Sequence, residues 1–494
     1  MINKEKLNEV LARREAILQG DAERVGKQKA DGKMTARERI ARLLDAGSFV
    51  ELDALLSRNG DYSGVVTGSG TVQDRPVYVF AQDFTVHGGA MGEMQAQKIC
   101  KLLDLAAKNP APVIALCDSA GVRVDEGARA MNAFSRIYAK MAQLSGVCPI
   151  LSLILGPVVG GAAMMSQLAD FSIQAETVGR LMVYGPQVVS AMTGRSIDAA
   201  ALGGAKAMAA QGGVTFTAVD EGEAIALAIR LLGMLPSSNR EGTDLVDSDD
   251  LNRLLPDADP DDSGALLSGV SDGGVFMELY PEWGRELRVA MARVGGHSVG
   301  LVVSNAKENN GELAPAACAK AARFIRFCDC YNLPVVSLIN SRGIQVPDEK
   351  AQSWSMITVT QLLYAYTEAT TAKVSVIVGN AIGQAFVAMA GKENADITYA
   401  WPGSVISALT PQAAVQILCA DEMKNSDGDP LAVRAALERK FADEIADGIA
   451  AASDGMIDDV ISPEETRKYI IAALETLAGK DAFTSVRKHG NMPL

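Results

Sequence analysis

The chain has 494 residues, of which 48% are hydrophobic and 21% are charged. This composition is typical of a globular protein with room for two or three domains, and it excludes a disordered chain. The 60 aspartates and glutamates outnumber the 46 lysines and arginines, which gives a formal net charge of −14. A nucleic-acid-binding protein needs a basic face, so this charge argues against a nucleic acid partner.

The seven cysteines are odd in number and lie in apolar segments, without the spacing of a disulfide framework or a zinc site. We therefore expect buried, reduced thiols and no metal site. The N-terminus is charged and has a helical pattern, which is not the pattern of a signal peptide. Glycine, proline or charged residues interrupt the long apolar runs, so we expect no membrane span and a cytoplasmic protein.

The first half of the chain begins with helices and continues with a short antiparallel sheet. Residues 1–45 alternate charged and apolar positions at helical spacing, which predicts one or two amphipathic helices that clasp a neighbouring surface. Residues 64–84 alternate between turn glycines, which predicts antiparallel strands. A helix over about 91–107 then opens a series of buried strands and helices.

A stretch rich in proline, aspartate and serine divides the chain. It covers residues 236–268, has little periodicity, and is interpreted as the linker between two halves. We place one domain at 1–255 and the other at 256–494. The elements expected in the second half are strands near 299–303, a helix over 314–331 and a polar, helical tail from 429 to 488.

The most informative feature of the sequence is an internal repeat. Residues 112–121 (PVIALCDSAG) are answered 222 residues later by 334–343 (PVVSLINSRG), and 156–163 (GPVVGGAA) are answered 223 residues later by 379–386 (GNAIGQAF). Each segment is an apolar run that ends in small residues, as in a buried parallel strand that leads into a glycine-rich turn. Two copies of one domain imply two comparable sites.

The residues Gly160, Gly161 and Ala162 predict a turn without bulky side chains at the start of a helix. Successive backbone N–H groups at such a turn are free to hold a developing enolate or another oxyanion. A single pair of glycines would more often serve close packing of a helix on a strand. The recurrence of the turn at Gly383 and Gln384, after an equivalent strand, favours a functional site.

Candidate side-chain bases and nucleophiles are scarce. Of the three histidines only His87 lies near the expected site, where a loop or packing role is the more common one. Ser119 and Ser341 occupy equivalent positions, but neither lies in the G-x-S-x-G motif of a nucleophilic serine. A charged cluster follows a strand and consists of Asp118, Arg123, Asp125 and Glu126. Such a cluster could position a ligand, but a solvated ion-pair loop is the more common outcome, and we expect it here. Two oxyanion turns without a base indicate chemistry in which the base comes from the substrate or a cofactor.

Several longer motifs resemble the carboxyltransferase β-subunits of biotin-dependent acyl-CoA carboxylases and the corresponding subunits of biotin-dependent acyl-CoA decarboxylases. The resemblance covers nearly the whole chain. It rests on residues 33–40 (KMTARERI), 81–89 (AQDFTVHGG), 156–162 (GPVVGGA), 320–325 (KAARFI), 363–370 (LYAYTEAT), 399–402 (YAWP) and 488–494 (KHGNMPL).

The resemblance implies an α/β fold of two crotonase-like domains in tandem, each a ββα superhelix. It also implies a homohexamer, with active sites between the first half of one subunit and the second half of another. A carboxyl group would move between carboxybiotin and the α-carbon of a short acyl-CoA, with the ureido nitrogen of biotin as the base. One turn would hold the thioester oxygen and the other the ureido oxygen. The implied catalytic residues are Gly160, Gly161, Ala162, Gly383 and Gln384, and those implied to bind acyl-CoA or biotin are Gly88, Gly89, Ser119, Gly121, Arg123, Gly343 and Val387.

The second half departs from the family pattern where the family binds biotin. At 340–347 the chain reads NSRGIQVP instead of DVPGFLPG, and at 379–386 it reads GNAIGQAF instead of RKAYGGAY. Gln384 still supplies a backbone N–H, although its side chain is large enough to crowd the turn. Val387 stands where some members have an aspartate, so the preferred acyl group stays open. The biotin-attachment sequence AMKM is missing, so we expect biotin to arrive on a separate carrier protein.

Three hypotheses follow. The leading one is the carboxyltransferase subunit of a multisubunit enzyme that also contains a biotin carboxylase. The first alternative is the same unit in a decarboxylase with a sodium-pumping membrane subunit, which would hold it peripherally at the inner membrane. The second is an accessory subunit in a mixed hexamer.

The substitutions Gly161→Val and Gly383→Val test the turns, because a side chain at Gly161 would fill the space needed by the thioester. We expect both variants to remain hexameric and to lose carboxyl transfer.

Overall fold

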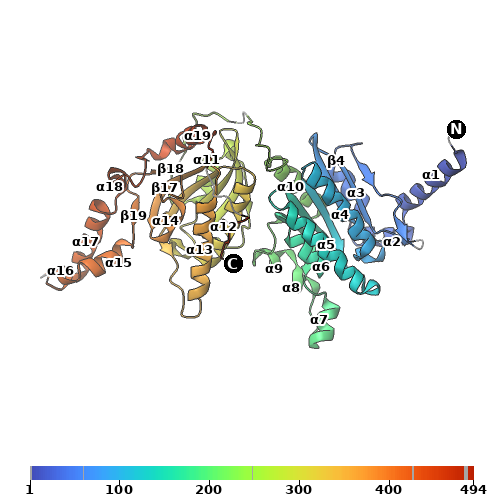
Figure 1. Ribbon diagram of the computed structural model, residues 1–494. Helices are drawn as coiled ribbons and strands as arrows, with labels where there is room; N and C mark the ends of the chain where they lie inside the picture. Colours follow the sequence, from blue (N-terminus) through green and yellow to red (C-terminus); the bar gives the residue numbers. More distant parts are fainter. Residues whose placement is uncertain are drawn as a thin grey trace. The chain divides into compact units, whose positions relative to one another are not determined.

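The computed structural model of the protein describes residues 3–58, 61–246, 249–256, 258–425, 428–482 and 488–493. The chain divides between Glu241 and Gly242 into two compact units, each with its own sheet (Figure 1). The division lies within the stretch 236–268 that predicts a linker. That stretch is not linker throughout, because the Asp262 side chain accepts a hydrogen bond from the Ala265 N–H and caps helix α11, Ser263–Val270.

The helices of the first unit are α1 (Lys4–Gln19), α2 (Ala22–Ala30), α3 (Ala36–Leu43), α4 (Glu93–Lys108), α5 (Ala128–Leu144), α6 (Gly161–Gln167), α7 (Pro186–Thr193), α8 (Ala199–Gly203), α9 (Ala205–Ala209) and α10 (Glu221–Leu232). Its strands are β1 (Val50–Leu52), β2 (Ser57–Arg58), β3 (Asp61–Tyr62), β4 (Val65–Val72), β5 (Arg75–Gln82), β6 (Val113–Ser119), β7 (Ile150–Val159), β8 (Phe171–Ala175), β9 (Arg180–Met182) and β10 (Phe216–Ala218). A short 3-10 turn, η1, covers His87–Gly89.

The N-terminal segment forms three helices where the pattern predicted one or two. The additional breaks come from helix caps. The Asp21 side chain accepts from the Arg24 N–H at the start of α2, and Thr35 and Glu38 form a capping box at the start of α3. Both signals are local and readable in the sequence.

The sheet of the first unit runs in the order β1-β4-β5-β6-β7-β8-β10, with β9 beside β7. Strands β4 and β5 are antiparallel, which confirms the prediction for residues 64–84, and the strands from β5 to β10 are parallel. The register between β6 and β7 shifts between Cys117 and Ser119. Because parallel strands end at one edge of a sheet, the ends of β6 and β7 lie side by side, with Ser119 paired to Val158.

The helices of the second unit are α11, α12 (Pro315–Cys330), α13 (Gln352–Glu368), α14 (Gln384–Met389), α15 (Pro411–Leu418), α16 (Ala420–Asn425), α17 (Pro430–Glu444), α18 (Gly448–Ser453) and α19 (Thr466–Thr476). Its strands are β11 (Phe276–Leu279), β12 (Leu287–Val294), β13 (His297–Ser304), β14 (Glu312–Leu313), β15 (Val335–Ser341), β16 (Gly343–Ile344), β17 (Lys373–Ile382), β18 (Ile397–Ala400), β19 (Val405–Ser407) and β20 (Asp459–Val460). The tail predicted to be helical therefore also contains a strand, and its residues 483–487 lie outside the described part of the chain.

The second sheet repeats the first. Its order is β11-β12-β13-β15-β17-β18-β20, with β19 beside β17, and its register shifts between Ile339 and Ser341. Even a buried lysine recurs: the Nζ of Lys98 donates to the Val65 carbonyl and that of Lys320 to the Trp283 carbonyl, both at 2.7 Å. Burial lowers the pKa of each to about 8. The prediction of two tandem copies of one α/β domain is confirmed.

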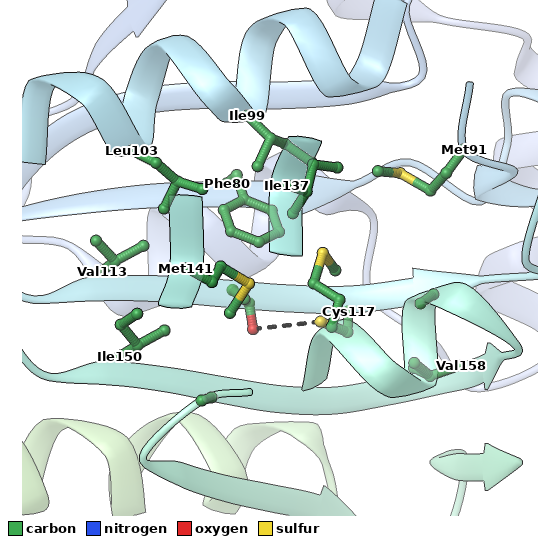
Figure 2. Packing of buried hydrophobic residues seen from close by; sticks show 14 of the residues in the cluster. Phe80, Met91, Ile99, Leu103, Val113, Cys117, Ile137, Met141, Ile150 and Val158 are labelled. Atoms are coloured by element: carbon green, nitrogen blue, oxygen red, sulfur yellow. Dashed lines mark hydrogen bonds between the residues drawn. The ribbon is translucent and has the colours of Figure 1, made fainter. Parts of the chain in front are cut away.

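The core of the first unit lies between its sheet and helices α4 and α5. Figure 2 shows Ile99 and Leu103 of α4 and Ile137 and Met141 of α5 around the ring of Phe80. Apolar side chains at helical spacing bury one face of each helix against the strands. This packing holds the strand ends, and therefore the turns that follow them, in place.

All seven cysteines belong to the described residues, and none of them forms a disulfide. Five of them are buried, Cys419 is half-buried, and Cys330 is exposed, so the expected burial is wrong for Cys330. Among the described residues, no helix combines the length and the apolar character that crossing a membrane requires.

Candidate active site

The predicted turn at Gly160 joins β7 to α6 in the first unit. Gly160 has φ 59° and ψ −122°, a conformation that side chains disfavour, and its N–H donates to the Met182 carbonyl at 3.0 Å. Helix α6 begins at Gly161, so the N–H groups of Gly161 and Ala162 lie in its first turn, where a helix offers them no internal partner. These N–H groups are suited to hold an oxyanion.

A second turn follows β6 and lies against the first one. The Ser119 hydroxyl donates to the Gly89 carbonyl at 2.8 Å and accepts from the Gly121 N–H at 3.1 Å, so it links the backbone of two loops. Gly121 has φ 109°, and a Cβ there would lie 3.2 Å from the Val159 carbonyl oxygen. Glycine at 121 therefore allows the two turns to approach each other.

The left-handed turn η1 lies beside the turn that follows β6 and is the third part of the site. His87, Gly88 and Gly89 have φ values of 51°, 62° and 64°, and the Gly88 carbonyl accepts a hydrogen bond from the Ala120 N–H at 2.8 Å. A Cβ on Gly89 would overlap the carbonyl oxygen of Asp118. Glycine at 89 thus allows the two backbones to approach each other, and His87 is held in a conformation that costs a non-glycine residue energy.

The second unit builds the same three parts. Gly383 has φ 55° and Gly343 has φ 106°, and residues 309–311 all have positive φ. The Ser341 hydroxyl donates to the Gly311 carbonyl at 3.0 Å and accepts from the Gly343 N–H at 3.2 Å. The backbone of the turn is therefore retained although the sequence around it departs from the family pattern.

In a Gly161→Val variant the new side chain would point into the core and not toward the space expected for the thioester. A Cβ on Gly161 would lie 2.8 Å from the Phe134 ring, which is buried in the core. Valine would disrupt this packing, so the expectation that it fills the space of the thioester is wrong. At Gly383 a Cβ would lie 3.1 Å from the Ala408 carbonyl oxygen.

The remaining predicted residues are placed as follows. Gln384 is the first residue of α14, and its side chain is exposed. Val387 lies one turn later, is also exposed, and donates its N–H to the Gly383 carbonyl at 3.2 Å. Arg123 is mostly buried, and its guanidinium binds both carboxylate oxygens of Asp125, at 3.2 and 2.7 Å.

Asp118 is buried and does not belong to a solvated loop, contrary to the prediction. Its carboxylate accepts from the Lys33 Nζ at 2.7 and 2.8 Å and from the Arg39 Nη1 at 2.9 Å. Arg39 also pairs with Glu221 and donates to the Leu155 carbonyl at 2.7 Å. We call Lys33, Arg39, Asp118 and Glu221 the buried quartet. Sequence reasoning missed it because its members are far apart in the chain.

The second unit has an amide where the first has Asp118. The Asn340 Nδ2 donates to the Pro260 carbonyl at 3.0 Å and to Asp261 Oδ1 at 2.9 Å. The Asn340 Oδ1 accepts from the Asn380 N–H at 2.9 Å. The two sites therefore share a backbone but differ in the charges behind it.

A basic pocket of about 300 Å³ lies beside η1 in the first unit. The Lys33 Nζ lies 4.1 Å from the centre of the Phe84 ring in its wall, and the Arg24 Nη1 donates to the Thr85 carbonyl at 3.1 Å. Cations beside an aromatic ring suit phosphates and a planar base. The sequence analysis did not single out Arg24 and Lys27. Their spacing of three residues on a predicted helix, which places both on one face, was a usable signal. The lining residues are Arg24, Lys27, Gln28, Asp31, Lys33, Phe84, Thr85, His87 and Gly88.

Comparison with known proteins gives relatives along the whole chain. The carboxyl transferase domain family matches residues 27–492. The chain is 39% identical to the carboxyltransferase subunit of propionyl-CoA carboxylase from Haloferax mediterranei, with 100% of both chains covered. It is 39% identical to the α subunit of methylmalonyl-CoA decarboxylase from Veillonella parvula, with 99% of this chain and 98% of that one covered.

A solved structure agrees with this assignment. The transcarboxylase 12S structure with methylmalonyl-CoA and methylmalonic acid bound superposes with a TM-score of 0.94 at 34% identity, over 100% of this chain and 99% of that one. Transcarboxylase 12S assembles as a hexamer. The expected pair of crotonase-like domains is thereby confirmed. With family match, identity and fold in agreement, the chain belongs to the carboxyl transferase family, the carboxyltransferases of biotin-dependent acyl-CoA carboxylases and decarboxylases.

Proposed function

We propose that this chain moves a carboxyl group between carboxybiotin on a separate carrier protein and the α-carbon of a short acyl-CoA. The observation that carries the proposal is the recurrence of the turn at Gly160 and Gly383, with φ values of 59° and 55°. Such a transfer has two carbonyl oxygens that gain negative charge, and two sets of backbone N–H groups match them.

The basic pocket supports assigning the first unit to acyl-CoA. Arg24 and Lys27 provide cations for phosphates, and Gly88 in the pocket wall is hydrogen-bonded to Ala120 beside the turn. In this arrangement the N–H groups at Gly161 and Ala162 hold the thioester oxygen. The turn at Gly383 then holds the ureido oxygen of biotin. Biotin, when its carrier brings it to the site, supplies the carboxyl group and a ureido nitrogen that acts as the base.

Transfer to free biotin tests the proposal without a partner protein. We expect the purified protein to convert methylmalonyl-CoA or malonyl-CoA to propionyl-CoA or acetyl-CoA when free biotin is the acceptor. Chromatography of the CoA esters measures the product. Absence of product with free biotin and also with purified biotin carrier proteins would contradict the proposal.

Acyl-CoA binding has a matched control on helix α2. We expect Lys27→Ala to weaken propionyl-CoA binding about tenfold or more, because it removes a charged hydrogen-bond donor to phosphate. Lys29 lies on the same helix but pairs with Glu38 at 2.8 Å, outside the pocket. Lys29→Ala should therefore bind like the wild type in isothermal titration. Propionyl-pantetheine, which lacks the nucleotide phosphates, should not distinguish the two variants; equal affinity of both for propionyl-CoA would refute the assignment.

We also propose a homohexamer. Helix α1 has 16 residues and buries none of them, and Leu7 and Leu11 are 47% and 54% exposed. An isolated helix of this length is marginal in water, so a covering surface supplied by another chain accounts for it. Light scattering should give a mass of about six times 51.9 kDa. A stable monomer at micromolar concentration would rule the hexamer out.

The same catalyst also fits a decarboxylase, and the identity to the Veillonella parvula subunit supports this second candidate. The direction of transfer would then depend on the partner. Co-purification with a biotin carboxylase indicates carboxylation, whereas co-purification with a polytopic membrane subunit indicates a decarboxylase held at the membrane.

A further inference from the structure

A cavity of about 530 Å³ lies in the second unit, at the end of the sheet opposite to the turn at Gly383. It is lined by residues at or before the amino ends of three neighbouring strands: His297 and Ser298 of β13, Pro334 before β15, and Ala372 before β17. The segment that ends and follows α19, residues 474–482, forms another wall. Neither the resemblance nor the proposed reaction uses this cavity.

In the first unit an arginine occupies the corresponding place. Arg75 begins β5 as His297 begins β13, 222 residues later, and both strands have eight residues. The Arg75 guanidinium donates to the Leu232 and Leu235 carbonyls at 2.6 and 2.8 Å and to the Ser237 hydroxyl at 3.1 Å. These acceptors lie at the end of α10 and in the segment after it. Helix α10 follows the last strand of the first sheet, and α19 has the same place in the second unit.

Histidine is shorter than arginine and leaves this space open. The His297 Nε2 stops at Glu475, 2.8 Å away on α19. Leu477, Lys480 and Ala482, which follow α19, line the cavity together with His297. The carbonyl end of a helix carries partial negative charge and favours a cation. The internal repeat therefore indicates which group fits: a guanidinium that reaches the end of α19.

The charged side chains around the cavity are consistent with a cationic ligand. The Lys480 Nζ is held by the Thr371 carbonyl at 2.8 Å and by Asp396 at 2.9 Å, and His297 is paired with Glu475. Among the described residues, the Asp481 carboxylate has no ion pair and the buried Ser298 hydroxyl has no hydrogen-bond partner. We propose that this cavity binds a small organic cation that carries a guanidinium group, at the place that Arg75 fills in the first unit.

The experiment uses n-butylguanidine as the probe and n-butylurea as its neutral counterpart of the same shape. In isothermal titration of the full-length protein, n-butylguanidine should bind saturably with one site per chain. Binding of n-butylurea should be at least tenfold weaker, because it lacks the charge.

Two reciprocal variants decide the location. His297→Arg places the guanidinium of the first unit in the second and should abolish binding of n-butylguanidine. Arg75→His opens the same space in the first unit and should give a second site per chain. If Arg75→His does not fold, the binding measured with His297→Arg alone shows whether the probe occupies the cavity. Undiminished binding by His297→Arg overturns the proposal. So does a wild-type protein that binds no probe, whether the cavity stays empty or an arginine of another chain fills it.

Discussion

Proline in place of Gln384 is expected to slow carboxyl transfer by about 10²–10³-fold, the usual cost of losing one oxyanion donor. Gln384 is the first residue of α14 and its side chain is exposed. Proline is favoured at the first position of a helix, where the missing N–H has no partner within the helix. The substitution therefore removes a donor and leaves the helix and the core unchanged.

Alanine at Gln384 is the matched control, because it removes the side chain but keeps the N–H. We expect Gln384→Ala to transfer carboxyl groups at nearly the wild-type rate, assayed with the carrier protein or free biotin. A Gln384→Pro variant with full activity would show that the second turn holds no oxyanion. The accessory-subunit hypothesis would then gain support. Gly383→Val should also lose activity, but its side chain would approach the Ala408 carbonyl and distort the backbone as well.

Replacing Asp118 by asparagine should destabilise the first unit by about 3–5 kcal/mol, the usual cost of breaking a buried ion pair. The two amino acids have the same shape, so packing is preserved. The change leaves the buried cations of Lys33 and Arg39 with Glu221 as the only carboxylate of the buried quartet. In the second unit the corresponding Asn340 is tolerated because the described groups that contact it are a carbonyl, a carboxylate and N–H groups, not cations.

Urea unfolding, followed by fluorescence and hydrogen exchange of the first unit, measures this loss. The double variant Asp118→Asn with Lys33→Met is the control, because removing one cation restores the charge balance. It should recover part of the lost stability. If Asp118→Asn unfolds at the wild-type urea concentration, the quartet does not contribute to stability as a network of charges.

The buried quartet shows why sequence reasoning went wrong at Asp118. The residue precedes Arg123, Asp125 and Glu126, and a run of charges on a loop is usually solvated. Its actual partner Lys33 is 85 residues away and its partner Arg39 is 79 residues away. A contact at that separation leaves no local pattern. The direction of a side chain at Gly161 was missed for the same reason, since Phe134 belongs to another helix.

The sequence by itself determined the duplicated domain, the places of the two turns and the family. These features are local, because a glycine with positive φ between a buried strand and a helix is required by its own backbone, as at Gly160 and Gly383. Only the tertiary structure decided what surrounds the turns and what lies at the opposite end of each sheet. Asp118 is paired with cations, Ser119 clips the backbone, and His297 leaves open a cavity that Arg75 fills in the other unit. Those properties arise from packing between distant segments, which one-dimensional patterns do not record.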